Sequence, residues 1–258
     1  MLAAARPRGH TLAVSASSVD DFAALARSSP WRWSTLRFTD GRIRAEARDG
    51  VRAWLRRPDA LRVETLGGAL AQIVHERGEH APWPGDDGAP GPEFRPDGLV
   101  AARPPRWDLS YDAPMYQDYF WVAMLDPVEL ADGGDWNDRD AGTALDVDGV
   151  SVVDHFGRPA WEAVVRPTEA YEPRCGCCAL LRTRRIDVLE YGAAMLADYP
   201  EAFRVRLDVG TGVCVQTEEI GGLSPGAGHE VRIEAVDEPM DDALFQDRPW
   251  WKRTVAHS

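Results

Sequence analysis

The chain has 258 residues, of which 44% are hydrophobic and 28% are charged, and its formal net charge is −13. This composition is typical of a folded globular chain. No run approaches the roughly 18–20 consecutive apolar residues that a membrane-spanning helix needs, which excludes a channel or a membrane-spanning receptor. The excess of 42 acidic over 29 basic residues disfavours binding to nucleic acid or to an anionic membrane surface.

The two ends of the chain differ from the part between them. Residues 1–17 are rich in Ala, Arg and Ser without an apolar period, which predicts a loose leader. The apolar stretch Leu12–Val14 is shorter than the roughly 7–15 residues of a secretion signal, so we expect a cytoplasmic protein. Residues 18–247 are expected to form a single domain with long insertions at 78–114 and 167–187, followed by a tail at 248–258.

In the first part of the domain, the spacing of the apolar residues changes from a helical period to the alternating period of a strand. Ser18 is a favourable N-cap for an amphipathic helix that carries Val19, Phe22 and Leu25 and ends before Pro30. Short runs are then separated by turn-type pairs, namely Asp40–Gly41, Asp49–Gly50, Pro58–Asp59 and Gly67–Gly68, which predicts an antiparallel meander of four or five strands. These runs are Trp31–Phe38, Ile43–Arg48, Val51–Arg56, Leu61–Thr65 and Ala69–His75.

The middle of the chain interrupts this meander. Residues 78–114 are rich in proline and glycine and predict a long surface excursion or lid. Apolar residues then recur over Tyr116–Leu130 and predict a helix, and an acidic loop follows at 132–148. The aspartates of that loop do not have the spacing of an EF-hand calcium site, so we interpret them as solvated.

The last part of the chain alternates again. The expected elements are a hairpin of Gly149–Phe156 and Ala160–Arg166, a helix at Leu189–Asp198, strands at Phe203–Val209, Val213–Glu219 and His229–Val236, and a closing turn at Met240–Phe245. Strands and helices do not alternate regularly, so a doubly wound fold is excluded. The order predicts the α+β class: one large curved antiparallel sheet, an unclosed β-barrel, with helices that cover its concave face.

Aromatic residues suggest what such a concave face contains. An antiparallel sheet with one covered face gathers large apolar side chains into a core or a cavity. The candidate ligand-binding residues are Trp31, Trp33, Trp54, Phe120, Trp121 and Trp161. For any one of these side chains, ordinary core packing is the simpler interpretation.

Four cysteines form the other candidate site. Cys175, Cys177 and Cys178 lie in the segment 167–187, and Cys214 follows a Gly-Thr-Gly turn. If Cys214 faces that segment, the four thiols predict a structural zinc site, with His229 as a substitute ligand. A disulfide or redox pair and plain thiols packed in a loop remain as alternatives. On a strictly alternating strand, Cys214 shares a face with Gln216 and Glu218, and we expect the cysteine segment to cover that face.

Motifs in the C-terminal half resemble those of the LolA-like lipoprotein carriers and the related RseB/MucB regulators. They are Gly157-Arg158-Pro159-Ala160-Trp161, Pro167 and Tyr171, the run Leu207–Val215, and the final elements Ile233–Asp237 and Asp241–Phe245. The resemblance is better over 148–247 than over 18–77. It implies an unclosed β-barrel that binds acyl chains or a lipidated protein, and an exported location, although the chain has no lipobox cysteine.

We therefore expect a non-enzymatic protein that binds a hydrophobic small molecule, such as a lipid or acyl chain, or docks a protein partner in the concave face. No resident cofactor is expected apart from the zinc. The alternative is a metal-dependent enzyme or a zinc-stabilised domain that uses the cysteine cluster.

Overall fold

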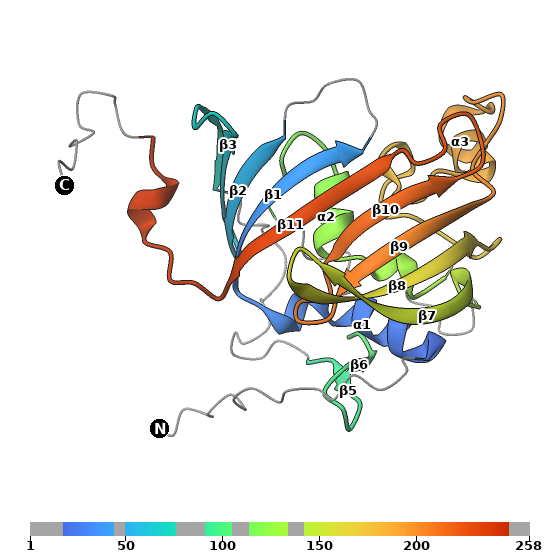
Figure 1. The fold of residues 1–258 in the computed structure, drawn as a ribbon, viewed down its shortest axis with the longest axis horizontal. Coiled ribbons are helices and arrows are strands. Elements are labelled where there is room, and N and C mark those ends of the chain that lie inside the picture. The colour runs from blue at the N-terminus through green and yellow to red at the C-terminus, as the bar shows by residue number, and fades with distance from the viewer. Residues whose placement is uncertain (1–17, 44–49, 76–90, 105–113, 134–141, 248–258) are drawn as a thin grey trace.

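A single nine-stranded antiparallel sheet organises the protein (Figure 1). The computed structural model describes residues 18–43, 50–75, 91–104, 114–133 and 142–247. The strand order is β4-β3-β2-β1-β11-β10-β9-β8-β7, so β4 and β7 form two open edges. The bounds are β1 (Thr35–Ile43), β2 (Val51–Arg56), β3 (Ala60–Thr65), β4 (Leu70–His75), β7 (Leu145–His155), β8 (Arg158–Pro167), β9 (Ala202–Asp208), β10 (Cys214–Ile220) and β11 (Gly228–Val236). The predicted α+β class and the unclosed curved sheet are confirmed.

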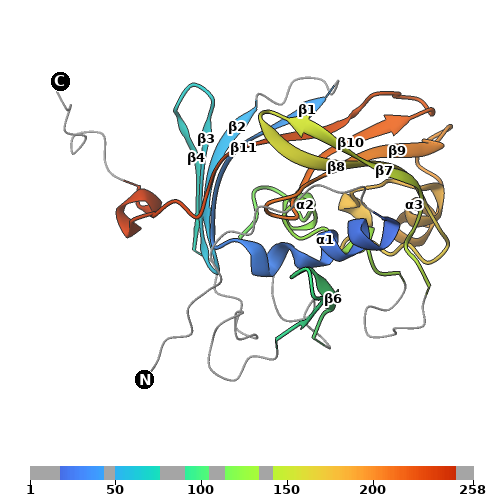
Figure 2. The same ribbon diagram turned by 60° about the horizontal axis from the view of Figure 1, so that its bottom comes forward.

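Helices cover the concave side of this sheet. Figure 2 shows α1 (Val19–Arg32) and α2 (Phe120–Leu125) beneath the curved strands. A small hairpin of β5 (Glu93–Phe94) and β6 (Val100–Ala102) packs on α1, where Val100 N donates to Ser28 Oγ at 2.8 Å. The remaining short elements are α3 (Arg184–Tyr191) and the 3-10 turns η2 (Val128–Leu130), η3 (Gly176–Cys178) and η4 (Asp242–Phe245).

The first helix begins as predicted but continues past Pro30. Ser18 and Asp21 form a capping box, with Asp21 N donating to Ser18 Oγ at 3.1 Å and Ser18 N donating to Asp21 Oδ2 at 2.8 Å. Arg32, in the last turn, donates to Val209 O at 2.9 Å and to Gly210 O at 3.0 Å. These bonds hold the helix end against the turn between β9 and β10, so Trp31 is helical and the first strand begins only at Thr35.

The meander is confirmed for β2, β3 and β4, while the turn expected at Asp40–Gly41 is wrong. Strand β1 runs through these residues because it pairs on both sides, with Asp40 opposite Val51 of β2 and opposite Val231 of β11. Ladder hydrogen bonds from two neighbours outweigh the local turn preference of Asp-Gly. The strand expected at Ile43–Arg48 falls mostly on residues 44–49, outside the described residues.

Two predicted helices differ from those in the structure. The helix expected over Tyr116–Leu130 is divided into α2 and η2, since Asp126 and Pro127 leave helical geometry. The helix expected at Leu189–Asp198 instead begins at Arg184, where Thr183 Oγ1 accepts from Ile186 N, and ends at Gly192 with φ of 75°. A left-handed glycine after the last turn is a common helix stop. Of the excursion at 78–114, the structure describes 91–104 and 114. Residues 134–141 of the expected acidic loop lie outside the described residues, and its last four residues, 145–148, belong to β7 instead of a loop.

One large cluster of buried apolar side chains fills the space between the sheet and α1 and α2, and a small second cluster lies elsewhere. The second cluster joins Ala60, Met240 and Phe245, with Trp54 packed against it. In the described parts of the chain, no helix combines the length and the apolar character that crossing a bilayer requires.

Candidate functional site

The segment before and within α2 presents aromatic side chains to the concave face. Trp121 is buried and its ring lies 5.2 Å from Phe38 of β1 and 5.4 Å, edge-on, from Tyr116. The neighbouring Phe120 is half-buried and meets the ring of His229 on β11 edge-on at 5.0 Å. Because Trp121 is buried in the core and Phe120 is only half-buried, Phe120 reaches the rim of the covered face.

Two hollows flank Phe120 at this rim. The first has a volume of about 370 Å³ and the second of about 300 Å³, and Asp118, Phe120 and His229 line both. The first extends over β10 towards the cysteine turn, through Thr217, Cys177 and Cys178 among others. The second extends towards β1 and β2 and includes Tyr116 and Trp121. Volumes of this size accommodate a small organic group.

His229 forms a fixed wall between the sheet and these hollows. Its Nε2 lies 2.9 Å from the Cys214 carbonyl oxygen, which only accepts, so Nε2 carries the proton and donates. The other ring nitrogen, Nδ1, is hydrogen-bonded to the Thr217 hydroxyl at 2.8 Å. Both ring nitrogens are therefore in use, and metal binding by His229 would break one of these bonds.

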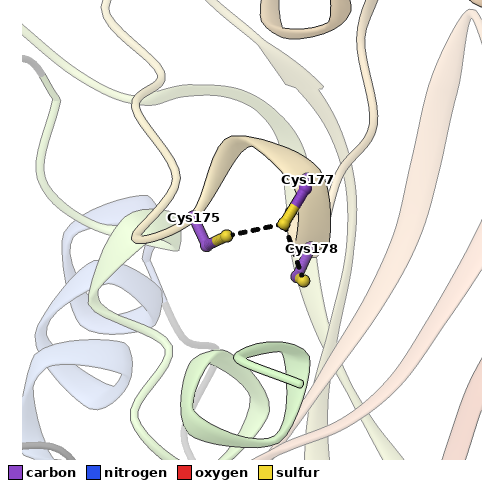
Figure 3. A group of neighbouring side chains, drawn as sticks. All are labelled: Cys175, Cys177 and Cys178. Carbon is purple, nitrogen blue, oxygen red and sulfur yellow. Dashed lines mark hydrogen bonds between the residues drawn. The ribbon is translucent and has the colours of Figure 1, made fainter. Parts of the chain in front are cut away.

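Three of the four predicted cysteine ligands come together. Cys175 Sγ lies 2.9 Å from Cys177 Sγ, which lies 3.2 Å from Cys178 Sγ, and all three sulfurs lie within 4.8 Å of one another (Figure 3). The sulfurs sit on the turn η3, with Cys177 exposed and the other two half-buried. We call these three residues the thiol trio.

The structure does not bring Cys214 to the thiol trio. A β-bulge between Cys214 and Gln216 breaks the alternation, since Cys214 pairs with Leu207 and Gln216 with the adjacent Arg206. Cys214 therefore shares the core side with the buried Leu207, and Gln216 lies on the other side of the sheet. The expectation that Cys214 and Gln216 share a face under the cysteine segment is wrong, and the four-thiol arrangement is not formed.

A buried carboxylate holds the cysteine segment from beneath. Glu129 Oε1 accepts from Tyr171 Oη at 2.6 Å and from Leu180 N at 2.9 Å, and Oε2 accepts from Arg174 N at 3.2 Å. Burial raises the pKa of Glu129 above its usual range, and these donors together with the charge of Arg174 oppose the shift in part. One side chain thus fixes both ends of the turn that carries the thiol trio.

A buried cluster of three charged side chains, Asp126, Arg103 and Arg174, also holds the cysteine segment in place. Asp126 accepts from Arg174 Nη2 at 3.0 Å and from Arg103 Nη1 at 3.1 Å, and all three side chains are at least 94% buried. Burial alone would raise the pKa of Asp126, but the charge and hydrogen bond of Arg103, together with the charges of Arg174 and Arg57, outweigh it and lower the pKa. The carboxylate is therefore ionised and ties the cysteine segment to α2.

Burial disfavours the thiolate form of two members of the thiol trio, Cys175 and Cys178. Burial raises the pKa of Cys178 to about 12, with added contributions from the neighbouring sulfurs and from Asp118, and burial also raises the pKa of Cys175. Nucleophilic cysteines have lowered pKa values, because the thiolate is the reactive form. Cys175 and Cys178 therefore lack the lowered pKa of a nucleophilic cysteine.

The tryptophans predicted as ligand-binding residues are dispersed. Trp33 is buried under the Arg57 guanidinium, 3.3 Å from its ring, and Trp31 lies 5.5 Å from Arg103 at the end of α1. Trp54 belongs to the second cluster, and Trp161 packs half-buried against the main core. Only Phe120 and Trp121 of the predicted set line the two hollows.

Sequence reasoning missed Asp118, Thr217 and Glu129. Glu129 had a usable signal, because it is a single carboxylate between Val128 and Leu130 in an apolar stretch, and a buried carboxylate needs partners. Asp118 and Thr217 have no comparable signal, since their place at the hollows depends on how α2 meets β10.

Comparison with known proteins gives a limited result. No family model and no curated protein matches the chain. Among solved structures, the chain is similar to one titled "Crystal structure of MucB", with a TM-score of 0.30 and 15% sequence identity. The match covers 87% of this chain and 60% of the MucB chain, so this chain spans less than two thirds of that length. This is a weak similarity, and it concerns the fold alone.

Proposed function

We propose that this chain is a non-enzymatic binding protein that takes an apolar group of a small molecule or of a protein partner into the concave rim beside Phe120. The observation that carries the proposal is the pair of hollows, about 370 and 300 Å³, that share Asp118, Phe120 and His229. The sequence resemblance to lipoprotein carriers is in keeping with the same kind of ligand.

The chemistry of the lining favours an apolar group with a polar end. Phe120 offers an aromatic face and Asp118 a charge to both hollows. Arg182 and Glu219 add charges to the first hollow, and Tyr116 and Trp121 add aromatic faces to the second. Binding sites of this type combine apolar walls with a few polar groups that fix the orientation of the ligand. A neutral or mixed head group suits these charges better than a strongly anionic one, because the chain carries a net charge of −13.

The test compares two alanine-to-leucine substitutions at half-buried positions. Ala179 lines the first hollow, whereas Ala243 lines a separate hollow beside η4 and Trp54. The probe is the neutral dye N-phenyl-1-naphthylamine, whose fluorescence rises in an apolar site, titrated into the metal-free, reduced full chain. We expect Ala179→Leu to weaken dye binding at least tenfold and Ala243→Leu to leave it within twofold.

The opposite pattern, or no saturable dye binding to the wild type, contradicts the proposal. Circular dichroism of both variants checks that they fold. Native mass spectrometry of the freshly purified chain then identifies the mass of any retained small molecule.

A further inference from the structure

The thiol trio is built as a ligand set. Three cysteines occupy four consecutive positions, and the turn η3 directs their sulfurs to one point, as Figure 3 shows. In the described parts of the chain this is the one group of three or more His, Cys, Asp or Glu side chains whose ligand atoms lie this close together. No disulfide joins any of the three, so all the sulfurs remain available as ligands.

Packing holds the trio in place without a metal. The main chain on both sides is bonded to the buried Glu129, and the Arg174 side chain is bonded to the buried Asp126. On its other side the turn lies against α3, where a Cβ atom at Gly176 would meet Glu190 Oε2 at 2.5 Å. A side chain at position 176 would therefore have to displace Glu190, and the turn is contacted from two directions. A preformed site loses little conformational entropy when a ligand binds.

We propose that Cys175, Cys177 and Cys178 bind one thiophilic metal ion, represented by Zn²⁺, through three thiolates, with the fourth position open to the hollow beside Phe120. Zinc–sulfur bonds of about 2.3 Å in tetrahedral geometry place the sulfurs roughly 3.8 Å apart. The sulfurs of Cys175 and Cys177 lie 2.9 Å apart, and those of Cys177 and Cys178 lie 3.2 Å apart. Each pair needs to separate by less than about 1 Å to admit the ion. Each thiol gives its proton to solvent as its sulfur–metal bond forms, and no oxidation takes place.

The fourth position follows from the surroundings of the trio. Cys177 and Cys178 line the same hollow of about 370 Å³ as Asp118 and Thr217, so the side of the ion away from η3 faces open space. Cys214 is fully buried in the core, outside the trio. Closed structural zinc sites have four protein ligands, whereas sites with three keep a position for water or another ligand. The inference thus extends the proposed binding function, because a metal at this wall would contact the polar end of a bound molecule.

The experiment uses the full chain, reduced and freed of metal under anaerobic conditions. Zn²⁺ is titrated against a chromophoric chelator, Co²⁺ serves as the spectroscopic probe, and X-ray absorption counts the sulfur neighbours of bound Zn²⁺. We expect one ion per chain, three sulfur neighbours with one or more lighter atoms, and a thiolate-to-cobalt charge-transfer band. Cys175→Ser, Cys177→Ser and Cys178→Ser should each weaken Zn²⁺ binding at least tenfold. Cys214→Ala is the matched control and should stay within twofold.

Alkylation of the wild type provides a measurement that does not depend on the folding of variants. Iodoacetamide should modify the exposed Cys177 in the metal-free chain and spare it when Zn²⁺ is present, while the buried Cys214 stays unmodified in both. Four sulfur neighbours, equal weakening by Cys214→Ala, or no protection of Cys177 by Zn²⁺ would overturn the inference. Because the dye titration is performed without metal, failure of this site and failure of the proposed apolar site are distinguishable.

Discussion

Replacing Glu129 with alanine removes the carboxylate that anchors the cysteine segment. Its two oxygens accept three hydrogen bonds, from Tyr171 Oη, Leu180 N and Arg174 N, at 2.6 to 3.2 Å. A buried donor left without an acceptor costs about 1–3 kcal/mol. Removing the carboxylate also removes the desolvation penalty of burying it, which is the penalty that raises its pKa. We therefore take the low end of this energy range for each of the three donors. The expected loss in free energy of unfolding is about 3 kcal/mol.

Glu129→Gln provides a graded control at the same position. The amide oxygen can still accept from Tyr171 and Leu180, but the amide nitrogen would face the Arg174 N–H, which is itself a donor. One hydrogen bond is lost, so we expect a decrease of about 1–2 kcal/mol.

The assay is urea unfolding followed by tryptophan fluorescence. The midpoint urea concentrations of the variants are compared when their m-values, the slopes of the free energy of unfolding against urea concentration, are equal. Trypsin cleavage after Arg174 should accelerate in Glu129→Ala, because the main chain there loses its anchor. Equal midpoints for the wild type and Glu129→Ala, or equal losses in both variants, would refute the anchoring role.

Two further changes test other parts of the fold. Asp126→Asn leaves the buried Arg103 and Arg174 without a counter-charge and should cost about 3–5 kcal/mol in urea unfolding, whereas Asp242→Asn, at an exposed ion pair, should not shift the midpoint measurably. The lowered pKa of Asp126 means that its contribution is present above its unfolded pKa of about 3.9 and is lost as pH falls through the lower folded value. Stability of the wild type should therefore fall more steeply below about pH 4 than that of Asp126→Asn, and parallel pH profiles would contradict this assignment. Gly212→Ala puts a Cβ 2.7 Å from Leu25 O at φ of 75° and should destabilise by at least about 2 kcal/mol. Gly149→Ala has open space at φ of 66° and should cost about 1 kcal/mol, so equal losses would show that the contact with α1 is unimportant.

Local signals predicted the fold well where one neighbour or one cap decides the structure. The Ser18 N-cap and the strands β2, β9 and β11 follow from period and turn chemistry, and the structure has them close to the expected bounds. Asp40–Gly41 shows the limit of this reasoning. A central strand with partners on both sides continues through a turn-prone dipeptide, and the number of partners is not visible in the local sequence.

The candidate site was predictable only in part for a similar reason. The proximity of Cys175, Cys177 and Cys178 follows from their spacing on one turn. The face of the sheet on which the Cys214 side chain lies depends on a β-bulge, because one extra residue in a strand moves the side chains that precede it to the opposite face. The dispersal of the tryptophans likewise depends on long-range packing. Trp54, for example, packs against Met240 and Phe245, which lie almost 200 residues later in the sequence.

The open sheet leaves two strand edges with unequal protection against aggregation. Along β7, Asp146, Asp148 and Asp154 are exposed, and the register shifts between Asp148 and Val150, so both charge and a bulge disfavour pairing with another chain. The opposite edge, β4 (Leu70–His75), carries no aspartate, glutamate, lysine or arginine. Contacts between molecules in concentrated solution should therefore begin along β4, and a lysine placed on that strand should raise solubility without touching the concave rim.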